Sequence, residues 1–121
     1  MVRLRDVGVE GVAQEAEELD LLDFTRCIEY RYTSDRSSME ASVLIRLVTE
    51  TDAELALLLE GVRSVRVPEA SPNLWFSELE IVDVRDRGME GIRFLVQSEH
   101  GGGFVAYCQN IQFVSYEAIR A

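Results

Sequence analysis

The side chains that most often act as nucleophiles, bases or metal ligands are scarce in this sequence. It has one histidine, His100, beside the glycine run Gly101–Gly103, and two cysteines, Cys27 and Cys108. No Gly-x-Ser-x-Gly motif accompanies the histidine, and one histidine with two separated cysteines cannot complete a four-ligand zinc site. Both cysteines fall in alternating apolar segments, where buried, unreactive thiols are expected. We therefore expect no catalytic residue, no metal and no cofactor.

Carboxylates offer a second kind of chemistry, as ligands of a cation or as an acid–base pair. Asp83, Asp86 and Glu90 surround one turn, but arginines lie between them. This spacing is typical of a salt-bridged surface turn and differs from the strict ligand order of a calcium loop. A pair of carboxylates is always available among 22 acidic residues, so a small carboxylate enzyme stays only a third hypothesis. Gly101–Gly103 lacks the Lys-Ser/Thr of a phosphate-binding loop and predicts a hairpin tip.

The acidic residues are concentrated near the N-terminus. The 121-residue chain has 12 basic residues, all arginine, against 22 acidic ones, which gives a net charge of −10. Between Asp6 and Thr25 there are seven acids and no basic residue. Such a block repels phosphate, so we expect no nucleic-acid ligand. Its field favours a basic protein partner.

A set of six residues is predicted to contact this partner. Tryptophan is enriched at interface hot spots, so the single tryptophan joins the acidic side chains of the block. Each feature also has an ordinary alternative, a solvated face for the acids and a core position for the tryptophan. The predicted contact residues are Glu15, Glu17, Glu18, Asp20, Asp23 and Trp75.

Two periodicities indicate the elements that position these residues. Residues 12–22 are rich in helix formers, and Val12, Ala16 and Leu19 would line one side of a short helix. From residue 24 onwards the apolar residues alternate with polar ones. Residues 28–32 and 41–47 therefore predict an antiparallel hairpin around a turn at 34–38.

The segment 51–61 fits two structures. Thr51 and Glu54 could form the capping box of a helix that ends at Gly61. Leu55, Leu57 and Leu59, however, alternate as in a strand, and we favour strand, turn and strand. A loop is expected between Pro68 and Asn73. Further strands are predicted over 79–83, 92–96, 104–108 and 111–115, with turns at 85–88, 101–103 and 110.

These elements predict a mainly β domain covering residues 1–121. The expected fold is an antiparallel β-sandwich, or a strongly curved antiparallel sheet, with one short N-terminal helix. No apolar run approaches the roughly 18 residues of a membrane span, and the first residues run into acids instead of an apolar signal segment. We therefore expect a cytoplasmic protein with reduced cysteines and no membrane partner.

The segment from Leu79 to Val96, which reads LEIVDVRDRGMEGIRFLV, and the segment FVAYCQ from Phe104 resemble small bacterial all-β immunity proteins. The run LALLLEGVRSVRVP from Leu55 is similar to their pattern of apolar strand, Gly-Val turn and apolar strand. The resemblance covers roughly residues 40–115 and rests on strand and turn chemistry. It implies that the chain binds and neutralises a toxin, often a nuclease. The acidic block lies outside the resemblance.

Our leading hypothesis is thus a non-enzymatic acidic binding protein, of the immunity kind, that masks a basic toxin. The alternative is a structural or assembly module that forms a homo-oligomer through its sheet edges.

Overall fold

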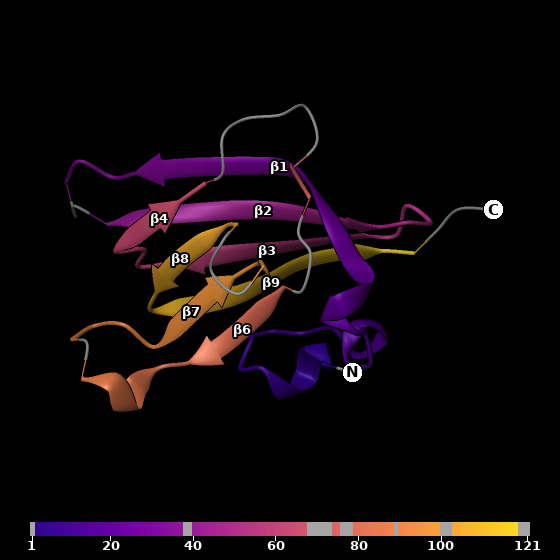
Figure 1. Cartoon of the computed structure of the whole chain (residues 1–121), viewed down its shortest axis with the longest axis horizontal. Helices are drawn as coiled ribbons and strands as arrows, with labels where there is room; N and C mark the ends of the chain where they lie inside the picture. The colour runs from indigo at the N-terminus through magenta and orange to yellow at the C-terminus, as the bar shows by residue number, and fades with distance from the viewer. Residues whose placement is uncertain are drawn as a thin grey trace.

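The chain folds into two antiparallel sheets (Figure 1). The computed structural model describes residues 2–37, 40–67, 74–75, 79–88, 90–99 and 103–118. The larger sheet has the strand order β5-β1-β2-β3-β9 and the smaller one the order β4-β8-β7-β6. The strands are β1 (Phe24–Ser34), β2 (Ala41–Thr49), β3 (Glu54–Glu60), β4 (Ser64–Arg66), β5 (Leu74–Trp75), β6 (Glu80–Asp83), β7 (Phe94–Gln97), β8 (Val105–Cys108) and β9 (Asn110–Glu117). The prediction of a mainly β, antiparallel fold is confirmed.

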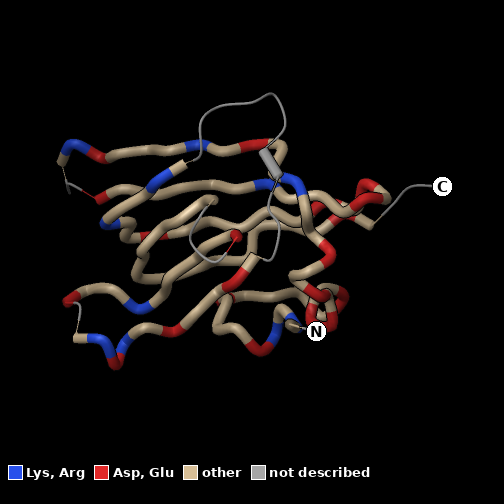
Figure 2. Tube along the Cα trace, in the orientation of Figure 1, with Lys and Arg blue, Asp and Glu red and all other residues tan. Residues whose placement is uncertain are grey.

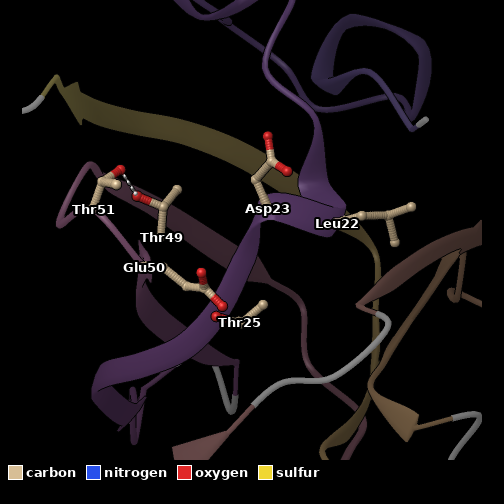
Figure 3. Close-up of a pocket in the computed structure, with 6 residues that line it drawn as sticks. All are labelled: Leu22, Asp23, Thr25, Thr49, Glu50 and Thr51. Atoms are coloured by element: carbon tan, nitrogen blue, oxygen red, sulfur yellow. Dashed lines mark hydrogen bonds between the residues drawn. The ribbon is translucent and has the colours of Figure 1, made fainter.

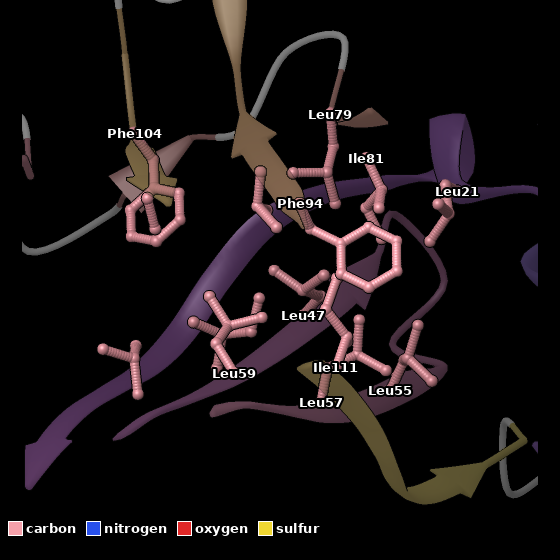
Figure 4. Packing of buried hydrophobic residues seen from close by; sticks show 14 of the residues in the cluster. Leu21, Leu47, Leu55, Leu57, Leu59, Leu79, Ile81, Phe94, Phe104 and Ile111 are labelled. Carbon is pink, nitrogen blue, oxygen red and sulfur yellow. The ribbon is translucent and has the colours of Figure 1, made fainter. Parts of the chain in front are cut away.

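The core lies between the two sheets because their apolar residues alternate with polar ones. On β2 and β3, Val43 faces Leu59, and Ile45 faces Leu57, and all four side chains are fully buried. All four belong to one buried cluster with Leu79, Ile81 and Phe94, and Figure 4 shows Leu57 and Leu59 on the same side of the core as the ring of Phe94. Residues 54–60 are thus a strand, as we favoured, and the predicted hairpin of β1 and β2 is confirmed.

The predicted helix over residues 12–22 is wrong. Short 3-10 turns take its place, η2 (Gln14–Ala16) and η3 (Leu21–Asp23), after a similar turn, η1 (Leu4–Asp6). An isolated helix of about ten residues is only marginally stable, so other backbone hydrogen bonds can determine the conformation of this segment. Leu4 N donates to Leu19 O at 2.8 Å, and Leu21 N donates to Val2 O at 2.9 Å. The segment 17–21 therefore pairs with residues 2–5 instead of coiling.

This N-terminal segment, residues 2–23, closes one end of the sandwich and one edge of the larger sheet. Leu4, Ala16 and Leu21 are fully buried in the core. Farther along, Glu10 N donates to Ile111 O, and Glu10 O accepts from Phe113 N, both at 2.8 Å. These hydrogen bonds pair some of the backbone N–H and C=O groups on the outer edge of β9, which would otherwise be unpaired. No helix in the described part of the chain is long and apolar enough to cross a membrane.

One two-stranded ladder runs through both sheets. Residues of β3 pair with β9, and the same two chain segments continue as β4 paired with β8. At the bend between the sheets, Gln109 N donates to Glu60 O and Arg63 N donates to Tyr107 O, both at 2.9 Å. Gly61 turns this corner with φ +63, and a Cβ there would lie 2.8 Å from the Cβ of Gln109.

The Gly61→Ala variant should therefore lose about 1–3 kcal/mol of unfolding free energy, measured by urea denaturation, because it adds both backbone strain and a close contact. Gly88 is the matched control, since its φ is +73 and a Cβ added there would have nothing within 4 Å. Gly88→Ala should cost less, because it adds strain alone. Equal losses for the two variants would show that the corner has room for a side chain.

Candidate functional site

A hollow lies at the end of the molecule that carries the N-terminal segment. It has a volume of about 340 Å³ and lies between η3, the start of β1 and the turn that joins β2 to β3 (Figure 3). We call it the acidic hollow, because Asp23 and Glu50 both line it with exposed side chains. Its lining residues are Leu22, Asp23, Thr25, Thr49, Glu50 and Thr51.

The β2–β3 turn holds its shape through the hydroxyl of Thr49. Thr49 Oγ1 accepts from Ala53 N at 3.1 Å and lies 3.1 Å from Thr51 Oγ1. The backbone closes the same turn, with Thr49 N donating to Ala53 O at 3.0 Å. Asp52 adopts φ +67, a left-handed conformation that aspartate tolerates better than most residues. These bonds position Glu50 and Thr51 at the rim of the acidic hollow.

The facing wall depends on a β-bulge and a capped turn. The pairing of β1 with β2 shifts between Phe24 and Arg26, so Thr25 is the extra residue, and such bulges redirect a side chain. Just before it, Asp20 Oδ1 accepts from Leu22 N and from Val2 N, both at 3.0 Å. The carboxylate of Asp20 thus caps η3 and ties it to the first residues of the chain.

These two backbone hydrogen bonds lower the pKa of Asp20 from its ordinary value of 3.8. A carboxyl with a lowered pKa in the folded state stabilises that state when it is charged, so its contribution is present above about pH 4 and is lost as the pH falls through the lowered pKa. Asp20→Ala should cost about 0.5–2 kcal/mol at pH 7, as for other lost caps. Asp20→Asn keeps an acceptor oxygen and should flatten the acid end of the stability profile, measured by urea denaturation between pH 2 and 7. If the unfolding free energy of Asp20→Asn falls with decreasing pH as steeply as that of wild type, Asp20 does not stabilise the fold through its lowered pKa.

The predicted contact residues divide into two groups. Glu18 is paired with basic residues, because Arg3 Nε lies 3.3 Å from its Oε2 and Arg5 Nη1 lies 2.5 Å from its Oε1. Asp20 is occupied by the backbone. Glu15, Glu17 and Asp23, in contrast, take part in no ion pair among the described residues, and Glu15 and Asp23 are exposed. The backbone of Trp75 pairs with Arg26 in β5, but its side chain lies outside what the structure describes.

The structure adds acidic residues that the sequence pattern did not indicate. Glu50 and Asp52 lie in the β2–β3 turn, and Glu50 joins Asp23 in the acidic hollow although 27 positions separate them along the chain. Figure 2 shows acidic residues gathered at this end of the molecule, on the N-terminal segment and on that turn. Arg26 is the cation that pairs with the turn, and its Nη2 lies 3.5 Å from Asp52 Oδ1. The run of Thr, Glu and Asp at 49–52 is a turn-forming signal that the alternation analysis did not use.

Several other charged groups on the described surface form local ion pairs. On the outer face of the larger sheet, Arg46 bridges Glu29 at 2.6 Å and Glu54 at 3.1 Å. The hydrogen bond from Arg46 lowers the pKa of Glu29 and that bond raises the pKa of Arg46 in turn. At the turn after β6, Arg85 Nη2 lies 2.8 Å from Asp83 Oδ2, which is the salt-bridged arrangement that the sequence indicated. The acidic hollow differs, because its two carboxylates have no such partner in the described chain.

The two thiols lie in the core. Cys27 and Cys108 are both free and buried, as the alternating pattern indicated. Burial raises the pKa of Cys27 to about 11 and that of Cys108 to about 12, so neither is a thiolate at neutral pH. Among the described residues, no group of three His, Cys, Asp or Glu is placed to hold a metal ion. His100, Gly101 and Gly102, like the expected loop from Pro68 to Asn73, lie outside the described residues.

Comparison with protein-family models, with curated proteins and with solved structures returns no match. The chemistry of the acidic hollow is therefore argued from its own residues. Two carboxylates and three threonine hydroxyls supply hydrogen-bond acceptors around an open space, and Leu22, 41% exposed, supplies an apolar wall. Such a set suits a long cationic side chain, whose charged head meets the oxygens while its aliphatic stem packs on the leucine.

Proposed function

We propose that this chain is a non-enzymatic acidic binding protein that captures a basic protein partner at the acidic hollow. The observation that carries the proposal is that Asp23 and Glu50 line one open space and that neither forms an ion pair within the described chain. An arginine or lysine of the partner would supply that cation. Arginine fits best, because its planar fork of donors can contact a carboxylate and hydroxyls together.

In this proposal, the other acidic residues of the N-terminal segment act on the association of the partner and not on its direct contacts. Glu15 and Glu17 add negative charge to the N-terminal segment, which lies at the same end of the molecule as the acidic hollow, and they form no ion pair within the described chain. Charges of this kind raise the association rate and orient the partner, and they contribute little to the final affinity. Glu18 and Asp20 contribute mainly to the fold of the segment.

In its specific form, the proposal is that the partner is a toxin and that binding neutralises it in the cytoplasm. The likeness of residues 40–115 to immunity proteins and the strongly negative charge support this form. Both cysteines are unbridged, which suits a reducing compartment.

The test is co-expression with the protein encoded by the adjacent gene. We expect that protein to be basic, to stop growth alone and to be harmless when this chain is present. Purified together, the two should form a complex whose dissociation constant rises with ionic strength. A neighbour that is harmless alone, or that kills equally in the presence of this chain, would overturn the toxin form. A complex insensitive to salt would overturn capture by the acidic end.

A further inference from the structure

Within the described residues, the larger sheet has an open edge along β1. On that side, β5 pairs only with Arg26 and Cys27, and no other strand among the described residues pairs there. The stretch from Ile28 to Ser34 therefore presents backbone groups that can accept a further strand. The opposite edge of the sheet, at β9, is partly covered by the segment around Glu10.

The side chains along this edge are unusually exposed for apolar residues. Ile28 and Tyr32, both within the open stretch, are each 51% exposed. Ile28 is the extra residue of a second β-bulge, between Cys27 and Glu29. Tyr30 lies between them and is partly buried, with its ring packed edge-on against Phe104 at 6.0 Å between centroids. Exposed apolar residues on an unpaired strand mark an interaction surface.

We propose that two copies of this chain pair here, antiparallel, about a two-fold axis at Tyr30. A two-fold axis places each residue opposite its symmetry-related position, so only a residue on the axis meets itself. With the axis at Tyr30, Glu29 of each copy lies opposite Arg31 of the other, and opposite charges across strands are favourable. Ile28 of one copy also comes next to Tyr32 of the other.

The neighbouring registers are disfavoured by charge. An axis at Glu29 sets two carboxylates opposite each other, and an axis at Arg31 does the same with two guanidinium groups. An axis at Tyr32 brings Glu29 opposite Asp35. Like charges directly opposite are destabilising, so these three registers are weaker than the one with its axis at Tyr30. β5 occupies the edge opposite Cys27 and limits the ladder to residues 28–32 of each copy.

This arrangement also keeps the acidic ends apart. β1 begins at Phe24, beside the acidic hollow, and runs away from it. Antiparallel pairing therefore places the two acidic hollows at opposite ends of the dimer, which reduces the repulsion between two chains of net charge −10. Each hollow stays accessible to a partner.

The experiment is sedimentation velocity of the full chain over rising protein concentration. Wild type should pass from monomer to dimer. Arg31→Glu should raise the dimer dissociation constant about tenfold or more, because two like-charged cross-strand pairs replace two opposite ones. Arg31→Lys, the matched control, should keep the dimer. The side chain of Arg31 is 66% exposed, so these variants leave the core intact.

A second pair of variants tests the apolar contact. Tyr32→Lys should abolish the dimer, whereas Val114→Lys, at a 45% exposed position on β9, should leave it unchanged. A wild type that stays monomeric throughout would overturn the proposal, and so would equal effects of Arg31→Glu and Arg31→Lys. Neutralising Asp23 and Glu50 should not alter dimerisation, so this proposal and the proposed function fail separately.

Discussion

Neutralising both carboxylates of the acidic hollow, by Asp23→Asn with Glu50→Gln, should weaken capture of the basic partner about 10- to 100-fold. Close charge pairs at interfaces couple by about 1.5–7 kcal/mol, and exposed surface pairs by about 0–1 kcal/mol. The hollow lies between these cases, because it is concave but its acids are exposed. The measurement is the dissociation constant of the purified complex at fixed ionic strength.

A matched variant separates local contact from net charge. Asp86→Asn with Glu90→Gln removes the same charge from exposed positions in and just after the turn η4 (Arg85–Arg87). We expect less than a threefold change in affinity from this double variant. Salt screens the interaction between exposed charges that are farther apart than the Debye length, which is about 8 Å at physiological ionic strength. If both double variants weaken binding equally, the acidic hollow is not the contact site.

Truncating the central aromatic residue of the core, Phe94→Ala, should lower the unfolding free energy by about 3–5 kcal/mol. Phe94 is 1% exposed, and its ring packs between the sheets (Figure 4). The guanidinium carbon of Arg93 lies 4.7 Å from the ring centroid. The ring also closes on Gly8, where a Cβ would lie 2.9 Å from its Cζ atom. Its loss would therefore loosen both the sandwich and the N-terminal segment.

Urea denaturation measures this loss, with two comparison variants. Phe94→Leu keeps most of the apolar volume and should cost less than Phe94→Ala. Val114→Ala, at an exposed position, should fall within about 0.5 kcal/mol of wild type. Because domains of this kind have about 5–15 kcal/mol in total, Phe94→Ala should remove a large part of the stability. A loss below about 1 kcal/mol would show that the core repacks around the missing ring.

Most of the strands follow from the sequence, because alternation is a local property. Leu55, Leu57 and Leu59 repeat every second residue, and this period outweighed the capping signal of Thr51 and Glu54. For the segment 12–22 the local pattern gave the wrong prediction. Its helix formers favour a helix locally, but residues 2–5 offer its backbone better partners, and such contacts are invisible in a local pattern.

The candidate site was only half predictable for the same reason. Asp23 belongs to the acidic block, which composition alone indicates. Glu50 does not, and it lines the same hollow as Asp23 only because β1 pairs with β2 and brings the β2–β3 turn beside η3. The sequence also could not separate Glu18 and Asp20 from the rest of the block. Their partners are arginines and backbone amides that the fold brings back from the first residues.

The ladder shared by the two sheets bears on how the protein folds. The segments 54–66 and 105–117 pair along almost their whole length, yet about 40 residues separate them in the chain. Closing so long a loop costs entropy before any contact repays it, and such non-local pairings slow folding. We expect this closure to set the refolding rate. Substitutions inside the ladder should then change refolding kinetics, whereas those in the N-terminal segment should mainly accelerate unfolding.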